Sequence, residues 1–385
     1  MVRVPEVKKR AEINIQTNVK ILIKALVVVW FLACIIYVIY LCSLWTRSES
    51  LENQTSKPKA KSKNANLIEC YKLGRPVPPD GIRLFDVLES DRKPRPGKSI
   101  FFHETSCPES GFMILGPRQV CSIESAAKHN PNMDIFVLFT SPRYILRDKV
   151  SKDLMRLLVS YDNIFLRNND MWKYSENSSA AQFLETEQIF ESSYFPVHLS
   201  DFLRLLSIWK FGGIYMDSDV IVKRTFENLP LNYGGLEEHS ARLNNGLIGL
   251  DSKGFGPLIG QMFIDDFTKN YNAGGWASNG PELITRVLIK VCNATDLKGI
   301  APEKCKGFKV HPRSMFWAVS WVDANDFFNP DKLTDLETIT NNSYSIHVFN
   351  HLTKDIMHKV GTNSLYGLMA REHCPLTYNN VGDFL

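Results

Sequence analysis

Several patterns that mark common classes of protein are missing from this 385-residue sequence. Its eight cysteines form no C-x-x-C pair, so the usual spacing of zinc ligands is absent. No repeat of roughly 20–50 residues recurs, which excludes solenoids and propellers. Net positive charge is missing from most of the chain. Residues 1–47 hold seven of the 45 Lys and Arg and two of the 41 Asp and Glu, so residues 48–385 hold 38 basic and 39 acidic residues. The basic footprint of a nucleic-acid-binding domain is therefore excluded.

Charge is also absent from residues 25–45, ALVVVWFLACIIYVIYLCSLW. A helix needs about 20 apolar residues to cross a bilayer, whereas a cleaved signal peptide has a shorter apolar region that ends in small residues. A core helix would show a polar face. Six Lys and Arg precede this segment and Arg47 follows it, so the positive-inside rule leaves the N-terminus in the cytosol. We predict a cytosolic tail over residues 1–24, a transmembrane signal anchor over 25–45 and a luminal remainder.

Two further features fit a luminal location. Cysteines 34 and 42 lie in the predicted anchor, and the remaining even number suggests disulfides in an oxidising compartment. The local candidate pairs are Cys107–Cys121 and Cys292–Cys305, which leaves Cys70 and Cys374; six cysteines allow about fifteen pairings, so other pairings stay open. Sequons for N-glycosylation occur at Asn53, Asn177, Asn293 and Asn341.

The luminal part divides into a stem and one globular domain. Residues 46–75 are rich in Lys, Ser and Asn, and proline punctuates the sequence to about Pro96; such a composition cannot bury a core, so we predict a flexible stem over 46–96. From 97 to 385, short apolar runs (99–103, 133–140, 163–166, 214–216) alternate with helical patterns (119–129, 152–158, 199–211). This alternation predicts an α/β domain with a mostly parallel sheet and a ligand site at the carboxyl ends of its strands.

Acidic residues are concentrated directly after the predicted strand 214–216. Asp217 and Asp219 flank Ser218, and in extended chain two residues two apart point to the same side, so both carboxylates can face one divalent cation. An isolated D-x-D is also typical of a solvated turn. Upstream, Asp201 and Arg204 share one face near the start of the predicted helix, where free N–H groups can bind phosphate or sugar hydroxyls. A helix cap with its salt-bridge partner is the ordinary alternative.

These residues resemble a known family. The stretch S-D-x-x-R (200–204) followed by W-K-F-G-G-I-Y-x-D-x-D (209–219) is similar to the sugar-binding D-x-D region of the α1,4-glycosyltransferases related to lactosylceramide 4-α-galactosyltransferase. It is more distantly similar to the clostridial glucosylating toxins. Further segments resemble that family in the expected order: FFHETS (101–106), CSIESAAKHNP (121–131), SNGPELITRVL (278–288), HVFNH (347–351) and AREHCP (370–375). Phe349 stands where the family pattern has tryptophan.

The resemblance implies a GT-A-type, Rossmann-like fold and a single luminal catalytic domain of a type II Golgi membrane protein. It implies retaining transfer of galactose or N-acetylgalactosamine, from UDP-galactose or UDP-N-acetylgalactosamine, in α1,4 linkage to a terminal galactose-type sugar of a glycolipid, with Mn²⁺ as cofactor. Asp219 would bind the metal and Asp217 the ribose or metal-bound water, while Asp201 and Arg204 would hold the donor sugar. The residues beside the uridine would be Phe102, His103, Ser200 and Tyr215. His347 is a candidate metal or diphosphate ligand, or a core histidine.

The chemistry agrees with these roles. Breaking a sugar–UDP bond puts negative charge on the β-phosphate, which a divalent cation stabilises, and oxygen ligands suit manganese. For the group that stabilises the opposite face of the sugar, four candidates stay open: Glu237, Glu238, Asn244 and Asn245.

Two other readings of the same residues remain. Residues 217–220 also match the D-x-D-x-V motif of haloacid-dehalogenase-like phosphatases, with Asp265 and Asp266 as a later acidic pair. However, that motif follows a fully apolar first strand, and here Gly213 and only three apolar residues precede it. The other reading is a transferase-like sugar-binding protein without activity. The intact donor-site residues count against that loss of activity.

Overall fold

The structure, a computed structural model, describes residues 30, 34–38, 65–72, 81–107, 115–141, 144–146, 157–237 and 242–385. The predicted cytosolic tail, Asn53 and most of the predicted anchor lie outside these ranges. Within the ranges, no helix combines the length and the apolar composition that a membrane crossing needs. Residues 63–385 form one compact unit, and the fold described below is that of this unit.

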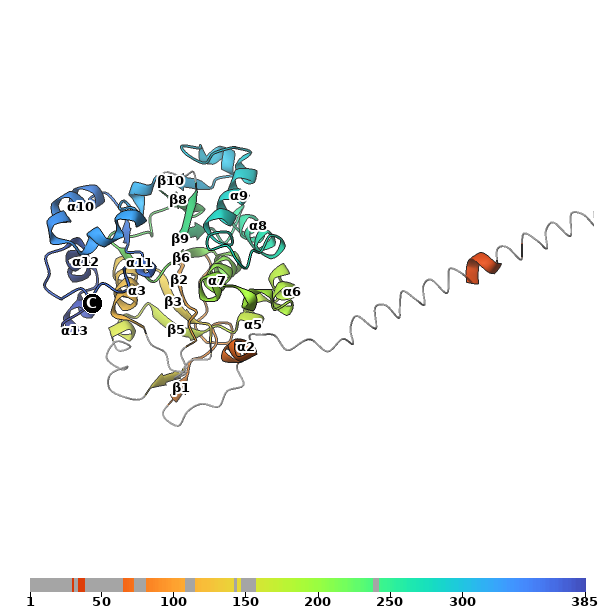
Figure 1. The fold of residues 1–385 in the computed structure, drawn as a ribbon, viewed down its shortest axis with the longest axis horizontal. Helices are drawn as coiled ribbons and strands as arrows, with labels where there is room; N and C mark the ends of the chain where they lie inside the picture. The colour runs from red at the N-terminus through yellow and green to blue at the C-terminus, as the bar shows by residue number, and fades with distance from the viewer. Residues whose placement is uncertain are drawn as a thin grey trace, which may run out of the picture. The chain divides into compact units, whose positions relative to one another are not determined.

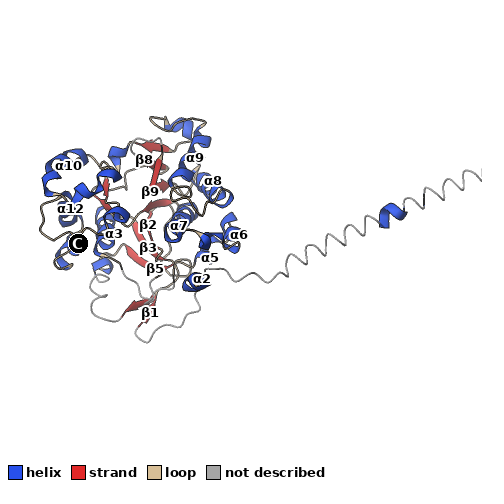
Figure 2. Ribbon diagram, viewed as in Figure 1, coloured by secondary structure: helices blue, strands red, loops and turns tan. Residues whose placement is uncertain are grey.

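A seven-stranded sheet runs through the middle of the unit (Figures 1 and 2). In spatial order its strands are β10 (Lys309–His311), β8 (Tyr233–Leu236), β9 (Leu243–Leu250), β6 (Gly213–Met216), β2 (Ser99–Glu104), β3 (Asp134–Phe139) and β5 (Ile164–Asn168). The pairings from β6 to β5 are parallel, as is β10–β8, whereas β9 runs antiparallel to both of its neighbours. The prediction of an α/β domain with a mostly parallel sheet is confirmed.

Helices cover both faces of the sheet, as its buried central strands require. On one face lie α7 (Phe195–Phe211), α8 (Gly256–Lys269) and α9 (Pro281–Cys292), packed with Phe101 and Phe136. On the other face α3 (Pro117–His129) packs with Phe102 and Val137. Alternate residues of β2 and β3 thus enter two separate hydrophobic clusters. Figure 2 shows the helices on either side of the strands.

The helix before the D-x-D residues begins earlier than predicted and ends where predicted. Helix α7 starts at Phe195 rather than at 199, with a proline at its first turn, a position where proline loses no helical hydrogen bond. Gly212 and Gly213 end it with φ angles of 64° and 91°. A Cβ on Gly213 would collide with the carbonyl oxygen of Ser99 in β2. The glycines therefore let the chain enter β6 beside β2 without a linker.

The predicted stem 46–96 is too long. Residues 65–71 form helix α2 (Ala65–Tyr71), in which Ile68 and Tyr71 are buried in the main hydrophobic cluster. The Cys70–Cys107 disulfide fixes this helix to the segment that follows β2. The prediction weighed the overall polarity of residues 46–75 and missed that these few apolar residues are enough to dock one short helix.

The C-terminal part forms a third cluster against α3. Strand β11 (Ser345–His347) pairs antiparallel with β7 (Val220–Val222), with His347 opposite Val220. Around them lie α10 (Leu333–Thr340), α11 (Asn350–Thr353), α12 (Leu365–His373) and α13 (Pro375–Asn380). The remaining elements are β1 (Gly81–Arg83), β4 (Tyr144–Leu146), α5 (Met171–Ser175), α6 (Ser179–Glu185) and the short 3-10 helices η1 (Gln188–Glu191), η2 (Pro302–Cys305), η3 (Arg313–Met315), η4 (Trp321–Phe328) and η5 (Pro330–Lys332).

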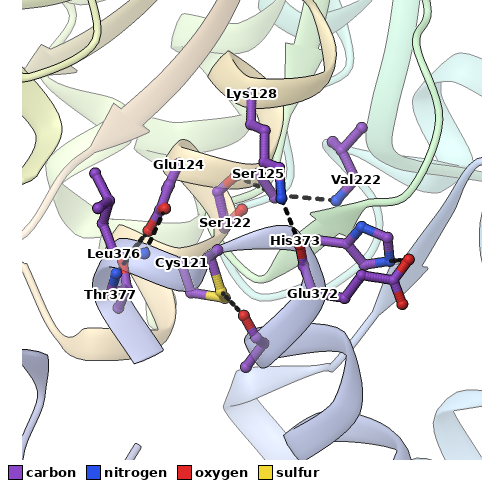
Figure 3. Close-up of a disulfide and its surroundings, with 12 residues drawn as sticks. Cys121, Ser122, Glu124, Ser125, Lys128, Val222, Glu372, His373, Leu376 and Thr377 are labelled. Carbon is purple, nitrogen blue, oxygen red and sulfur yellow. Dashed lines mark hydrogen bonds and ion pairs between the residues drawn. A yellow bond between two sulfur atoms is a disulfide. The ribbon is translucent and has the colours of Figure 1, made fainter. Parts of the chain in front are cut away.

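The disulfides correct two of the expected pairings. Cys292–Cys305 is formed as predicted. The expected Cys107–Cys121 and Cys70–Cys374 pairs are wrong, since Cys107 bonds Cys70 and Cys121 bonds Cys374. Cys121 lies inside α3, facing the C-terminal helices (Figure 3). Its partner is 253 residues away in sequence, so pairing cysteines by their nearness along the chain gave the wrong partner for Cys121.

Candidate active site

A cavity of about 750 Å³ opens at the carboxyl ends of β2 and β6. This is the sheet edge at which parallel α/β folds place their ligands. Its walls come from the end of β2, the starts of α3 and α7, the D-x-D segment, β9 and the segment after β11. The residues that line it are His103, Glu104, Thr105, Gln119, Pro196, Val197, Ser200, Asp201, Arg204, Tyr215, Asp217, Ser218, Asp219, Glu237, Arg242, Asn244, Asn245, Trp276, Pro281, Trp321, His347, Phe349, Asn350, His351, Leu352 and Lys354.

Three ligand-bearing side chains meet in this cavity. One atom each of Asp217, Asp219 and His347 lies within 4.8 Å of the others. Nε2 of His347 is 3.1 Å from Oδ1 of Asp219 and 4.0 Å from Oδ2 of Asp217. The second oxygen of Asp219 accepts a 2.7 Å hydrogen bond from the backbone N–H of Asn350. The β11–β7 pairing therefore brings a histidine 128 residues away onto the D-x-D segment.

The charges of this group stabilise one another. Burial alone would raise the pKa of the Asp219 carboxyl, but the neighbouring His347 and the hydrogen bonds from His347 and the Asn350 N–H lower it below its ordinary value. Burial would likewise lower the pKa of His347, but the nearby carboxylates, Asp219 above all, raise it. Asp219 is therefore ionised near neutral pH. Asp217 is the more open carboxylate, with 27% of its side chain exposed against 13% for Asp219.

Asp201 and Arg204 form a buried pair on α7. Nη2 of Arg204 is 3.2 Å from Oδ1 of Asp201, and Nη1 is 3.3 Å from Oδ1 of Asp217. The guanidinium also donates to the carbonyl oxygen and hydroxyl of Ser200 and to the carbonyl oxygen of Asn245. Burial raises the pKa of Asp201 to about 6, against the opposing effect of Arg204. Oδ2 of Asp201 is buried and has no hydrogen-bond partner within the described part of the chain.

The residues expected beside the uridine divide into two sets. The Tyr215 hydroxyl donates to Oδ1 of Asp217 at 2.6 Å and lies 3.1 Å from the Ser200 hydroxyl. The ring of His103 stacks on that of Tyr215 with centroids 5.9 Å apart, and burial lowers the pKa of His103 to about 3. Phe102 does not line the cavity: its side chain belongs to the second hydrophobic cluster, because successive residues of a strand face opposite sides.

Two glycines let other chain segments approach these side chains closely. A Cβ on Gly246 of β9 would lie 2.7 Å from Oδ2 of Asp217 and 2.9 Å from Oδ1 of Asn244. A Cβ on Gly280, just before α9, would lie 2.8 Å from both carboxylate oxygens of Asp201. Such distances are shorter than a carbon atom tolerates, so glycine is needed at both positions for this arrangement.

Two conserved regions of known proteins match the chain over these elements. Residues 116–235 match the glycosyltransferase sugar-binding region containing the DXD motif, and residues 253–381 match the alpha 1,4-glycosyltransferase conserved region. Lactosylceramide 4-alpha-galactosyltransferase of Rattus norvegicus is 30% identical over 302 residues, which cover 77% of this chain and 79% of that protein. This chain belongs to the α1,4-glycosyltransferase family.

Other members of the family differ in the sugar that their names give. Lactosylceramide 4-alpha-galactosyltransferase of Homo sapiens is 27% identical over 86% of this chain and 88% of its own length. Alpha-1,4-N-acetylglucosaminyltransferase of Homo sapiens is 29% identical over 68% of this chain and 75% of its own length. The resemblance drawn from the D-x-D region is confirmed, and with it an α/β glycosyltransferase fold.

The cavity also contains residues to which the sequence analysis gave no role. His351 and Lys354 lie in the cavity wall four and seven residues after His347, so the run HVFNHLTK held a signal that was read only as far as His351. The Gln119 amide donates to Oε2 of Glu104 at 2.8 Å and lies 3.5 Å from the Ser218 hydroxyl. Nothing in the local sequence singles out Glu104 or Gln119, because their role depends on where β2 ends and α3 begins.

Three of the four candidates for stabilising the opposite face of the donor sugar lie in the cavity wall. Glu237, Asn244 and Asn245 all line the cavity, whereas Glu238 lies outside the described residues. Glu237 accepts hydrogen bonds from Arg242 and from the Asn244 amide. Asn245 donates to Oδ1 of Asp201 at 2.7 Å.

The acidic pair that the phosphatase interpretation requires does not lie beside the D-x-D residues. Asp265 and Asp266 lie on α8, and neither lines the cavity. Asp266 pairs with Arg286 and Lys290, and Asp265 accepts hydrogen bonds from Ser179 and Gln261. Both carboxylates therefore serve the packing of the helical face.

Proposed function

We propose that this chain is a retaining α1,4-hexosyltransferase that moves galactose or N-acetylgalactosamine from a UDP-sugar to a terminal galactose-type sugar of a glycolipid. The observation that carries the proposal is the single cavity in which Asp217, Asp219 and His347 converge beside the buried Asp201–Arg204 pair. A cavity of about 750 Å³ is within the usual size range of small-ligand sites. The galactosyltransferase names of the relatives support galactose as the donor sugar.

The side chains around the D-x-D fit Mn²⁺. Two carboxylates and one imidazole whose ligand atoms lie within 4.8 Å of one another form a hard, oxygen-rich donor set. Asp219, Asp217 and His347 would hold the ion, with Asp219 as the principal ligand. When bound, such a cation neutralises the diphosphate and stabilises the negative charge on the departing UDP. Without a cation, the carboxylates would repel the diphosphate.

The chain's own residues would orient the donor sugar. The unpartnered Oδ2 of Asp201 is free to accept a hydrogen bond from a sugar hydroxyl, since its other oxygen already pairs with Asn245 and Arg204. Arg204 holds Asp201 and Asp217 at a fixed separation, because its guanidinium is fixed by Ser200 and Asn245 and lies over the Tyr215 ring. His103, Ser200 and Tyr215 would lie beside the uridine, where the neutral His103 can contact a base without adding charge.

We also propose that the protein is a single-pass type II protein of the Golgi membrane with its catalytic domain in the lumen. The 25–45 anchor and the preceding cations support this topology, as do three disulfides, which persist in oxidising compartments. Asn177, Asn293 and Asn341 are all exposed and can be reached by the glycosylation machinery.

A donor panel tests the reaction. Full-length protein in detergent is incubated with UDP-galactose, UDP-N-acetylgalactosamine or UDP-N-acetylglucosamine, with Mn²⁺ or with a chelator, and with or without a glycolipid that ends in galactose. We expect Mn²⁺-dependent release of UDP with one of the first two donors and an α1,4-linked product. Donor binding without release of UDP would instead support the sugar-binding alternative. Preference for UDP-N-acetylglucosamine would reject the proposed donor class.

A further inference from the structure

Two half-exposed tryptophans from distant parts of the chain line the cavity. Trp276, in the connection between α8 and α9, is 44% exposed, and Trp321, at the start of η4, is 49% exposed. Aromatic side chains bind mainly through the area that they bury, and Trp and Tyr are concentrated at binding surfaces for this reason. A large indole left open on the wall of a ligand cavity is therefore a ready contact surface.

Trp276 is held in place and lies close to the D-x-D residues. Its ring stands edge-on to that of Tyr194, with centroids 5.3 Å apart, and lies 5.5 Å from the ring of His351. Tyr194 in turn contacts the buried His198. His351 belongs to α11, the helix whose Asn350 N–H donates to Asp219. The indole thus contacts the residue next to Asn350, whose N–H binds Asp219, and because neighbouring rings hold it, it loses little rotamer freedom when a ligand binds.

The chemistry of galactose matches such a surface. In the chair form of a β-galactoside, the C–H groups at C3, C4 and C5 form an apolar patch on one face, while the axial 4-hydroxyl projects from the opposite face. An aromatic ring attracts polarised C–H groups and shields apolar area from water. A galactoside that lies with this patch on an indole therefore turns its 4-hydroxyl away from the indole.

We propose that Trp276 is the platform on which the acceptor galactose lies, so that its 4-hydroxyl points across the cavity toward the donor sugar. The inference rests on the proposed function and names the acceptor subsite of the same cavity. In the transfer, the bond from O4 to the donor C1 forms and the bond from C1 to the UDP oxygen breaks. The electron pair of the broken bond and the proton of the 4-hydroxyl both end on the departing UDP. A glucoside has an equatorial 4-hydroxyl and offers neither the same patch nor the same direction of attack.

Binding of a simple acceptor analogue tests the platform without requiring turnover. Saturation-transfer NMR is recorded on the full-length protein in detergent with UDP, Mn²⁺ and methyl β-D-galactoside. We expect the strongest transfer to H3, H4 and H5, and weaker binding of methyl β-D-glucoside. Trp276→Ala should weaken galactoside binding about tenfold, the scale of a lost aromatic contact, and Trp276→Phe should restore part of it. UDP affinity should not change in either variant. Leu258→Ala removes an exposed apolar side chain of α8 outside the cavity and serves as the control.

Each contrary result has a distinct meaning. Normal galactoside binding by Trp276→Ala overturns the platform, as do equal binding of the glucoside and absence of galactoside binding by the wild type. A loss of UDP affinity in the folded Trp276→Ala and Trp276→Phe variants would place the indole in the donor site and also overturn it. If galactoside binding depends on Trp276 but no UDP-sugar is consumed, the platform stands and the proposed reaction fails.

Discussion

Asp219 and Arg204 lie in one cavity, but their surroundings assign them different tasks. Asp219 points both oxygens at groups that hold it in place, His347 and the Asn350 N–H, and faces the candidate metal position. Arg204 is 4% exposed and donates to Ser200 and to the carbonyl oxygen of Asn245. Asp219 would therefore bind the metal, and Arg204 would hold the side chains around the donor sugar in position.

We predict that Asp219→Asn lowers kcat by roughly 100-fold or more, the scale of losing one electrostatic stabiliser, and that excess Mn²⁺ restores little. Arg204→Lys keeps the charge but loses the planar fork that reaches Ser200, Asn245 and Asp201. This variant should impair transfer while UDP–Mn²⁺ binding persists. Transfer kinetics together with calorimetry of UDP and Mn²⁺ separate the two effects. Loss of UDP binding in Arg204→Lys with normal turnover of Asp219→Asn would reverse the assignment.

Gly246 offers a test of the metal site in which none of the proposed ligand residues is itself substituted. In Gly246→Ala the new methyl group would lie 2.7 Å from Oδ2 of Asp217, so that carboxylate must turn away. We expect Mn²⁺ affinity in the presence of UDP to fall about tenfold, with a loss of stability of at most ~1–3 kcal/mol from overpacking. Gly274→Ala is the control, because its Cβ would meet only Oδ1 of Asn272, at 3.7 Å. Unchanged Mn²⁺ affinity would show that Asp217 is not a ligand.

At the scale of elements, local sequence patterns predicted individual helices and strands but not the pairing of distant strands. The strand and helix around residues 199–216 were predicted from apolar spacing and the Gly-Gly stop, and they differ from α7 and β6 mainly in where the helix begins. The place of His347 depended on the pairing of β11 with β7 across more than a hundred residues. No local pattern records such a pairing, so the sequence could not place His347 beside the D-x-D residues.

The start of α13 depends on one buried carboxylate of α3. Glu124 is 1% exposed and accepts hydrogen bonds from the backbone N–H groups of Leu376 and Thr377 and from the Thr377 hydroxyl (Figure 3). A carboxylate at a helix N-terminus satisfies free N–H groups and also complements the helix dipole.

In Glu124→Gln, an amide N–H₂ must face one of those donors. We expect the free energy of unfolding to fall by about 1–3 kcal/mol, the cost of leaving buried donors unsatisfied. Denaturant unfolding measures it, with Glu185→Gln on the exposed end of α6 as the matched control. Equal stability of the two variants would show that the Glu124 hydrogen bonds add nothing to the stability of the C-terminal helices.

The same region predicts sensitivity to acid. Burial lowers the pKa of His373 to about 3, with help from the nearby His129, Lys223 and Lys128. Below the ordinary histidine pKa of about 6.5, the unfolded chain takes up a proton that the folded chain refuses. Stability contributed by neutral His373 is therefore present above that pH and is lost as pH falls toward 3. The melting temperature of wild type should fall more steeply from pH 7 to about 4 than that of His373→Gln. Parallel curves would contradict this origin.

For the whole molecule, the sequence pattern predicted the fold class well but predicted poorly which distant segments contact one another. The strand–helix alternation led to one α/β domain, and the absence of excess positive charge beyond residue 47 excluded a nucleic-acid-binding domain. Two of the three disulfide pairs and the docked α2 were missed because both depend on which surfaces meet after folding. Cys121 bonds a cysteine 253 residues away only because α3 packs against the C-terminal helices.

The orientation of the whole chain gives the last prediction. Cations before residues 25–45 should keep the N-terminus in the cytosol, and residues 63–385 should then fold in the lumen. There the exposed Asn177, Asn293 and Asn341, together with Asn53, can receive glycans. Expressed in animal cells, the protein should lose apparent mass on treatment with a glycosidase, and each Asn→Gln substitution at an occupied site should remove one step. In sealed microsomes, an added protease should trim only the N-terminal tail. An unglycosylated chain that the protease degrades fully would refute the luminal location and the Golgi proposal together.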